Sequence, residues 1–261
     1  MLKINLRIMK IINSKILNAL LLLIIFVCLT ECKKDEPKIP TTLTDIDGNS
    51  YNVIVIGTQA WMKENLRVTS YSNGDPIPNV TYGYNGPTWC YLTSPGYCWY
   101  NNDPTNYKAT YGALYNWYTV NTGKLCPSGW HVPIDAEWTT LTDYLTNNGY
   151  GYQGSGDDIA KSLATISGWN TYYDVGTPGN DPASNNSSGF SALPVGPRTN
   201  TESEITNASF VTPGPEGWWW SATEIDATYA GSMVLSFNSN IVMRPRSPKQ
   251  FGESVRCIKD K

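Results

Sequence analysis

The sequence CPSGWHVPIDAEW, residues 126–138, contains the start of the helix that the chain predicts most clearly. Pro133 and Asp135 are typical of a helix start, and we expect Asp135 to act as the N-cap. Three apolar residues then recur at helical spacing: Trp138, Leu141 and Leu145. This pattern predicts an amphipathic helix over about 136–145 whose apolar face packs on the core.

The rest of the chain favours short elements. The apolar residues of 112–120 predict a second helix that ends before Gly123, and 158–165 has short helical potential. The pair Asp47-Gly48 predicts the turn of a hairpin over 43–56, whereas 68–110 is rich in residues typical of loops. Further strands are predicted at 190–193, 218–222, 230–237 and 253–258. Two helices, short strands and long loops favour an α+β fold with antiparallel sheets.

Residues 1–31 have the pattern of an export signal. Four cations precede an apolar run, Ile16 to Leu29, that is short for a membrane span. Cys32 follows as in the lipobox of bacterial lipoproteins, although Glu31 replaces the small residue expected there. We therefore predict a signal peptide over 1–31 and lipidation of Cys32, with simple secretion as the alternative.

The segment after Cys32 refines this localisation. Residues 32–36, CKKDE, resemble the acidic export tag of surface lipoproteins in Bacteroidetes. Residues 32–42 are expected to form a tether to the domain over 43–261. The resemblance implies a protein of the cell outer membrane that is held by a lipid anchor, such as palmitate, and exposed at the cell surface.

Composition narrows the classes of function. Removing residues 1–31, which carry four cations and one Glu, changes the formal net charge from −3 to −6. This charge, without a basic stripe, excludes nucleic acid as a partner. All 10 Trp and 17 Tyr follow residue 50, which argues against disorder of the remaining chain.

Four cysteines remain after Cys32: Cys90, Cys98, Cys126 and Cys257. Export to an oxidising compartment makes disulfides the expected state, with three possible connectivities. The turn Ser94-Pro95-Gly96 predicts a bridge between Cys90 and Cys98, which leaves Cys126 with Cys257. A zinc site is disfavoured because the chain has no C-x-x-C motif and one histidine.

Six ordered blocks resemble a known family. They are DIDGN at 45–49, WMKENL at 61–66, YGALYNW at 111–117, CPSGWHVP at 126–133, WWSATE at 219–224 and SVRC at 254–257. Together they are similar to the Fibrobacter succinogenes major paralogous domain over about 43–260. That family in turn resembles the C-type-lectin-like fold of formylglycine-generating enzymes. The resemblance implies that the chain ends pair in one sheet, to which a Cys126–Cys257 bridge would fasten the helical half.

An enzymatic function finds little support in the residues. His131 is the only histidine, and its neighbours favour a partly buried, hydrogen-bonded side chain. The formylglycine-generating enzymes use two nearby cysteines late in the chain, where this sequence has only Cys257. We therefore expect a protein that is not an enzyme, with an enzyme on that scaffold as the alternative.

A binding function has more material. Trp219 and Trp220 are expected in the core, because successive residues of a strand face opposite sides. The candidate ligand contacts lie in the late segment: Trp218, Tyr229, Asn238, Asn240 and Arg244. Aromatic rings and amides of this kind predict an adhesion module for glycan or a protein partner. A structural or display protein without a small ligand is the second alternative.

The acidic loop from Asp174 to Asp181 is a candidate calcium site. Carboxylate and amide oxygens are the ligands that calcium prefers, and lectin-type folds often hold the ion in this way. Neither tripeptide of calcium-dependent lectins, Glu-Pro-Asn or Gln-Pro-Asp, occurs in the chain. Calcium is thus the one cofactor that the sequence suggests.

Overall fold

A computed structural model describes residues 39–81, 89–154, 156–199 and 210–261. The predicted signal peptide, Cys32 and most of the tether lie outside the described residues. Those described from Pro40 onward belong to one compact unit. No helix in these ranges is both long enough and apolar enough to cross a membrane.

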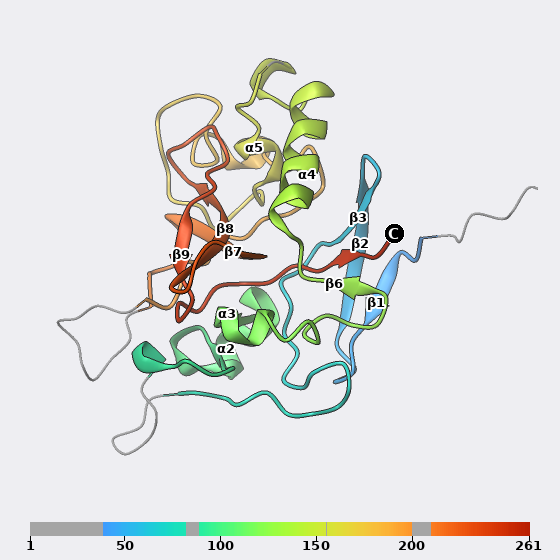
Figure 1. The fold of residues 1–261 in the computed structure, drawn as a ribbon. Helices are drawn as coiled ribbons and strands as arrows, with labels where there is room; N and C mark the ends of the chain where they lie inside the picture. Colours follow the sequence, from blue (N-terminus) through green and yellow to red (C-terminus); the bar gives the residue numbers. More distant parts are fainter. Residues whose placement is uncertain (1–38, 82–88, 155, 200–209) are drawn as a thin grey trace, which may run out of the picture. The chain divides into compact units, whose positions relative to one another are not determined.

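A five-stranded sheet brings the two ends of the domain together (Figure 1). Its antiparallel strands follow the order β1-β2-β3-β10-β6. Their bounds are Thr42–Thr44 for β1, Ser50–Ile56 for β2, Gln59–Met62 for β3, Ile258–Lys259 for β10 and Trp130–His131 for β6. The implied pairing of the chain ends in one sheet is confirmed.

The predicted hairpin at the start of this sheet is also confirmed. The Asp45 carboxylate organises its turn by accepting hydrogen bonds from the Asp47 and Asn49 amides at 3.0 and 2.8 Å. It accepts a third bond from the Tyr51 hydroxyl at 2.6 Å, and the Arg67 guanidinium covers the Tyr51 ring at 4.7 Å. A single buried carboxylate thereby fixes the connection between β1 and β2.

A second sheet corrects the predicted helix over 112–120. Residues Ala113–Tyr115 form strand β5, which pairs with β4, Tyr97–Trp99. Gly112 has φ of +74°, outside the helical region, and Ala113 N donates to Leu66 O at 2.9 Å. The helical spacing therefore loses to long-range backbone pairing, and only Trp117–Val120 forms helix α3.

Helix α2, Pro104–Tyr111, lies in the segment that the sequence assigns to loops and short strands. Asp103 caps it by accepting from Asn106 N at 3.1 Å, and Pro104 occupies the first helical position. Both features are typical of a helix start. Four short 3₁₀ turns lie among the described residues: η1 (Trp89–Tyr91), η2 (Tyr100–Asn102), η3 (Tyr152–Gly154) and η4 (Pro182–Ser184).

The third sheet contains the late strands. Its order is β7-β8-β9, with bounds Glu216–Glu224, Tyr229–Ser236 and Arg246–Pro248. Trp219 and Trp220 are fully buried and belong to different clusters of the core, as predicted. The predicted strand at 190–193 is wrong, because one isolated bridge between Ala164 and Ala192 is all that forms there. The predicted strand at 253–258 is reduced to β10 and single bridges of Glu253 and Ser254.

Helix α4, Asp135–Asn147, confirms the main helix and lies beside the β7–β8 hairpin in Figure 1. Asp135 is its first residue, so the predicted cap is wrong by one position, and the side chain of Ile134, which occupies the cap, has no atom that accepts a hydrogen bond. Glu137 instead accepts from Ile134 N at 3.0 Å, and Thr223 Oγ1 on β7 accepts from Asp135 N at 2.9 Å. Helix α5, Ala160–Leu163, lies within the predicted 158–165. The fold is α+β, with four α-helical segments among the described residues instead of two.

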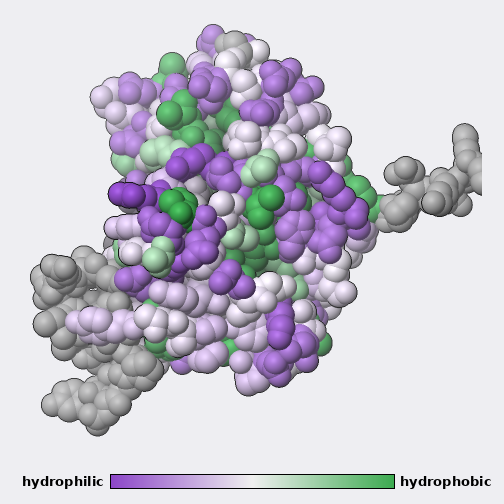
Figure 2. All heavy atoms as spheres, viewed as in Figure 1, coloured by the Kyte–Doolittle hydropathy of each residue, from purple (hydrophilic) through white to green (hydrophobic). Residues whose placement is uncertain are grey.

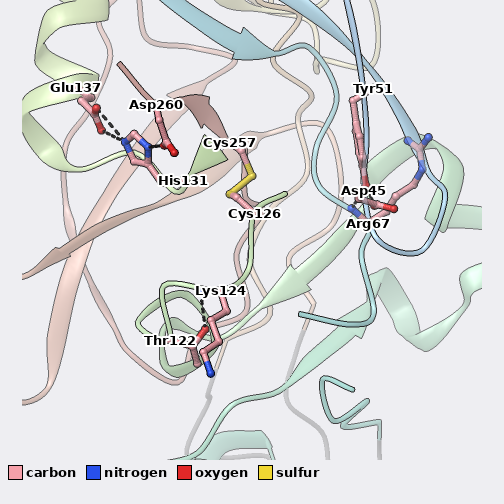
Figure 3. Close-up of a disulfide and its surroundings, with 10 residues drawn as sticks. All are labelled: Asp45, Tyr51, Arg67, Thr122, Lys124, Cys126, His131, Glu137, Cys257 and Asp260. Atoms are coloured by element: carbon pink, nitrogen blue, oxygen red, sulfur yellow. Dashed lines mark hydrogen bonds and ion pairs between the residues drawn. A yellow bond between two sulfur atoms is a disulfide. The ribbon is translucent and has the colours of Figure 1, made fainter. Parts of the chain in front are cut away.

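The disulfide prediction is confirmed in one half and wrong in the other. Cys126 and Cys257 form a bridge with a Cα–Cα distance of 6.0 Å, which fastens the loop before β6 to the residue before β10 (Figure 3). Cys98 is a free, buried thiol, so the predicted bridge to Cys90 is not formed; the Cys90 side chain lies outside the described residues. The intervening turn is held elsewhere, because Gly96 N donates to Asn116 Oδ1 and Thr119 Oγ1.

Candidate functional site

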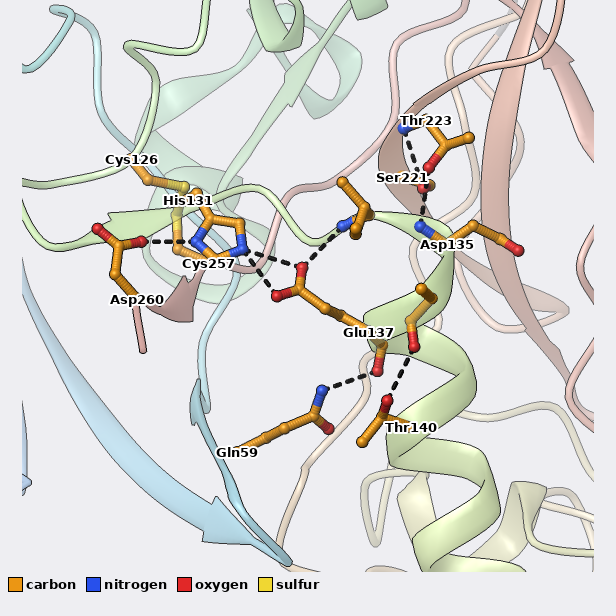
Figure 4. Close-up of polar contacts among 12 residues, drawn as sticks. Gln59, Cys126, His131, Asp135, Glu137, Thr140, Ser221, Thr223, Cys257 and Asp260 are labelled. Atoms are coloured by element: carbon orange, nitrogen blue, oxygen red, sulfur yellow. Dashed lines mark hydrogen bonds and ion pairs between the residues drawn. A yellow bond between two sulfur atoms is a disulfide. The ribbon is translucent and has the colours of Figure 1, made fainter.

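His131 lies between two carboxylates beside the disulfide (Figure 4). Its Nδ1 is 2.6 Å from Asp260 Oδ1, and its Nε2 is 2.9 Å from Glu137 Oε2. The three groups come from β6, from the residue after β10 and from the first turn of α4. The cluster therefore joins the terminal sheet to the main helix.

The electrostatics of this cluster favour a charged imidazolium. Burial lowers the pKa of His131, but hydrogen bonds to Asp260 and Glu137 outweigh it and raise the pKa above 6.5. An imidazolium that donates from both nitrogens has no lone pair with which to accept a substrate proton. His131 therefore links the terminal sheet to helix α4 through two ion pairs, in line with the hydrogen-bonded side chain that the sequence predicts.

The structure separates the five predicted ligand residues into different places. Tyr229 begins β8, and its ring is covered by the Arg246 guanidinium at 4.6 Å. Arg244 is paired with Asp135 at the start of α4. These two predicted contacts are therefore engaged with other side chains of the same domain.

Trp218, Asn238 and Asn240 lie near the other end of the β7–β8 hairpin. Trp218 is half-buried, and its Nε1 donates to Glu216 Oε2 at 2.8 Å. Glu216 is the cross-strand neighbour of Ser236, whose hydroxyl donates to Asn238 Oδ1 at 2.7 Å. Asn238 and Asn240 are exposed in the turn that follows β8.

This turn contacts an aromatic pair that sequence reasoning missed. The side chain of Tyr173 is 78% exposed, and its ring centroid lies 4.5 Å from that of Tyr172. Tyr172 in turn packs against the edge of Phe237 at 5.5 Å. We call Tyr172, Tyr173, Phe237 and Asn238 the tyrosine surface. Two adjacent aromatic residues in a polar loop were the signal in the sequence that could have indicated it.

The loop that carries the tyrosine surface is tightly connected to β8. Tyr172 N donates to Gly179 O at 3.0 Å, and Gly179 N donates to Phe237 O at 2.8 Å. A Cβ at position 179 would lie 2.4 Å from Asn170 O, so the approach requires glycine. A side-chain hydrogen bond with Tyr173 raises the pKa of Tyr172 to about 12.

The surface of the domain mixes polar and apolar groups. Figure 2 shows one face of the molecule, on which hydrophilic residues surround small hydrophobic patches. Small apolar patches among polar groups are usual for a protein surface. In the chain the exposed Tyr173 is followed by the exposed Asp174 and by Val175, which is 62% exposed.

The loop of the predicted calcium site, from Asp174 to Asp181, does not gather a cluster of acidic side chains. The part of the chain that the structure describes holds no group of three or more acidic, His or Cys side chains that could bind a metal ion. Asp174 and Asp181 use their backbone carbonyls within the loop, to accept from Thr177 Oγ1 and from Lys161 Nζ. The loop oxygens face an internal ammonium, where the sequence suggested an ion.

The fold and these sites define an α+β domain that is closed by a terminal sheet and a disulfide and that exposes an aromatic and amide surface. The chain belongs to the Fibrobacter succinogenes major domain family, whose model matches residues 54–259. No curated protein and no solved structure matches the chain. The matched range includes strands β3 to β10 and both cysteines of the bridge.

Proposed function

We propose that this protein is an extracellular binding module whose tyrosine surface binds carbohydrate. The proposal rests on the exposure of Tyr173, whose ring is held in place by Tyr172 and, through it, by Phe237. The face of an aromatic ring packs on the C–H groups of a sugar, whereas amides and carboxylates bond its hydroxyls. Asp174 follows Tyr173 in the chain and Asn238 follows Phe237, so each places such a polar group next in sequence to a ring.

The rigidity of the loop supports binding over simple exposure. Tyr172 N donates to Gly179 O, and Gly179 N donates to Phe237 O directly after β8, so the backbone of Tyr172 is fixed before a ligand arrives. Ordering a flexible side chain at an interface costs about 0.5–1.5 kcal/mol, which a preorganised pair avoids. A loop tyrosine without a ligand would not require these backbone bonds and ring contacts.

A glycan array with the full chain tests the proposal. Wild-type protein is expected to bind a subset of glycans, and Tyr173→Ala to weaken that binding by about tenfold or more, equivalent to about 1.4 kcal/mol. Tyr91→Ala is the matched control, because Tyr91 is also highly exposed, at 71%, and lies on η1. Uniform silence of the wild-type protein would contradict the proposal. Loss of binding in Trp218→Ala but not in Tyr173→Ala would move the site to the β7–β9 sheet.

We also propose that the fold is C-type-lectin-like. Two features support this assignment: the strands from both chain ends share one sheet, and a disulfide joins that sheet to the segment before the main helix. The proposal concerns architecture alone, since the same fold carries unrelated functions. An experimental structure whose strand order superposes on that class would support it.

The site of action follows from the N-terminal pattern. We propose that Cys32 is acylated and that the domain is held by lipid at the surface of the outer membrane. Multiple acyl chains make such an anchor effectively permanent, at about 0.8 kcal/mol per buried CH₂. Palmitate labelling that disappears in Cys32→Ala, together with release of the protein into the medium, is the expected result. Labelled Cys32→Ala protein would contradict the assignment.

A further inference from the structure

Lys161 places a buried ammonium at the centre of the loop that carries the tyrosine surface. The residue lies on α5 and is 8% exposed. Its Nζ donates to Asn185 Oδ1 at 2.7 Å, to Asp181 O at 2.9 Å and to Asn180 O, with Thr177 O at 3.5 Å. Burial lowers the pKa of this ammonium, so its environment works against the charge.

The four oxygens form a site for a cation. Three are backbone carbonyls and one is a side-chain amide, and all converge on one point. Carbonyl dipoles that point at each other in a buried place are unfavourable unless a positive charge lies between them. A bound ion would meet this need, and here a side chain of the protein meets it.

The same contacts connect the ammonium to the exposed rings. Asn180, whose carbonyl accepts from Lys161, donates through Nδ2 to Tyr173 O at 3.1 Å and to Tyr172 O at 3.4 Å. Only one residue therefore separates the ammonium from the backbone of both tyrosines. Gly179, the residue before Asn180, accepts from Tyr172 N and donates to Phe237 O, directly after β8.

Asn185 extends the connection to the far side of the loop. Its Oδ1 accepts from Lys161, while its Nδ2 donates to Thr165 O at 2.8 Å and to Pro178 O at 3.0 Å. Asp181, with φ of +45°, is in the left-handed region, which Asp adopts more readily than most residues with a side chain. Through Asn180, Asp181 and Asn185, both sides of the loop thus bond the same ammonium.

We infer that Lys161 is a built-in cation that orders the loop over 172–185 and thereby positions Tyr172 and Tyr173 for ligand. Removing the ammonium leaves a vacant site of neutral oxygens, which prefers an alkylammonium ion or a monovalent metal ion to calcium. The ordering role rests on the contacts above, and only its effect on ligand rests on the proposed carbohydrate function.

Hydrogen exchange in the full chain separates these two statements. Lys161→Ala and Lys161→Met are expected to accelerate amide exchange in 172–185 by about tenfold or more, as loss of a charge-assisted hydrogen bond implies. Lys124→Ala is the control, because Lys124 is exposed and its side chain lies in another loop. Unchanged exchange in both Lys161 variants would overturn the inference.

Chemical rescue tests the cation itself. Propylammonium replaces the atoms that Lys161→Ala removes beyond Cβ, whereas 1-propanol has a similar shape without the charge. Restored protection of 172–185 in propylammonium but not in 1-propanol supports the inference, including the case where the variant is destabilised throughout. Equal effects of the two compounds, or none, would overturn it.

Glycan binding is read separately. If the wild-type protein binds a glycan, Lys161→Ala is expected to weaken that binding and propylammonium to restore it. If the wild-type protein binds none, the carbohydrate function fails while the exchange result still decides the role of Lys161.

Discussion

Reduction of the Cys126–Cys257 bridge is expected to lower the free energy of unfolding by about 5 kcal/mol. The bridge joins residues that are 131 positions apart. In the chain-entropy model, closing a loop of this length removes about 17 cal/mol/K from the unfolded chain, or about 5 kcal/mol at room temperature. For a domain of this size the melting temperature should fall by about 10–20 °C.

The short strands of the terminal sheet favour a loss of stability of the full calculated size. Strand β10 has two residues, Ile258 and Lys259, and is placed between β3 and β6 by few backbone bonds. Reduction removes no side-chain atoms: the two sulfur atoms separate to van der Waals contact, and no cavity of side-chain size is left. The measured difference then reports loop closure and not a cavity.

Urea unfolding of the purified chain, with and without dithiothreitol, is the assay. The Cys126→Ala/Cys257→Ala variant should be insensitive to the reductant, and the Cys90→Ala/Cys98→Ala variant should keep the sensitivity of the wild-type protein. A shift on reduction below about 1 kcal/mol would refute the entropic reasoning. Sensitivity that persists in the first variant and disappears in the second would assign the bridge to the other cysteine pair.

Three further changes test the buried and half-buried charges. Replacing His131 with Gln should lower the free energy of unfolding by about 1 kcal/mol or less near pH 6, measured by urea unfolding. Because the folded pKa is raised above 6.5, this stabilisation is present below that pH and is lost as the pH rises through the folded value. A loss of stability in His131→Gln that does not become smaller towards pH 9 would contradict a charged His131 between the two carboxylates. Burial raises the pKa of Glu253 to about 8, so wild-type stability should decline between pH 4.5 and 8 by up to about 1.4 kcal/mol per unit. Glu253→Gln should lack this decline. Parallel curves of stability against pH for the wild-type protein and the variant would contradict the raised pKa of Glu253. Arg256 is fully buried and donates to Asn65 Oδ1 and to the carbonyls of Phe190 and Ser191. Arg256→Lys should therefore lower the free energy of unfolding by about 3 kcal/mol or more, measured by urea unfolding. An unchanged free energy of unfolding would refute the stabilising role of these bonds.

The main helix shows how far local pattern reaches. The spacing of Trp138, Leu141 and Leu145 predicts α4, and all three side chains are fully buried. Asp135 was expected to cap this helix but is its first residue, and its N donates to Thr223 Oγ1, on a strand 88 residues later in the chain. A side-chain acceptor from so distant a strand leaves no mark in the sequence around the helix.

The segment over 112–120 shows where local pattern fails. Leu114 has helical spacing from Trp117, yet its strand pairs with β4, and Tyr115 N donates to Glu253 O at 2.9 Å. In the same pairing Cys98 lies opposite Leu114, where it is a buried, free thiol. The wrong helix comes from long-range backbone pairing, which short-range periodicity does not contain.

The tyrosine surface was missed for a related reason. In a fold with so little regular structure, loops are ordered by single polar side chains: Asp45, Lys161, Asn185 and Arg256 each bond several backbone groups or turns. Such residues look solvated in the sequence, whereas most tryptophans that look available for a ligand are in the core. The candidate for recognition is therefore the side chain that the ordered loop leaves exposed, and Tyr173 meets that condition more fully than Trp218 does.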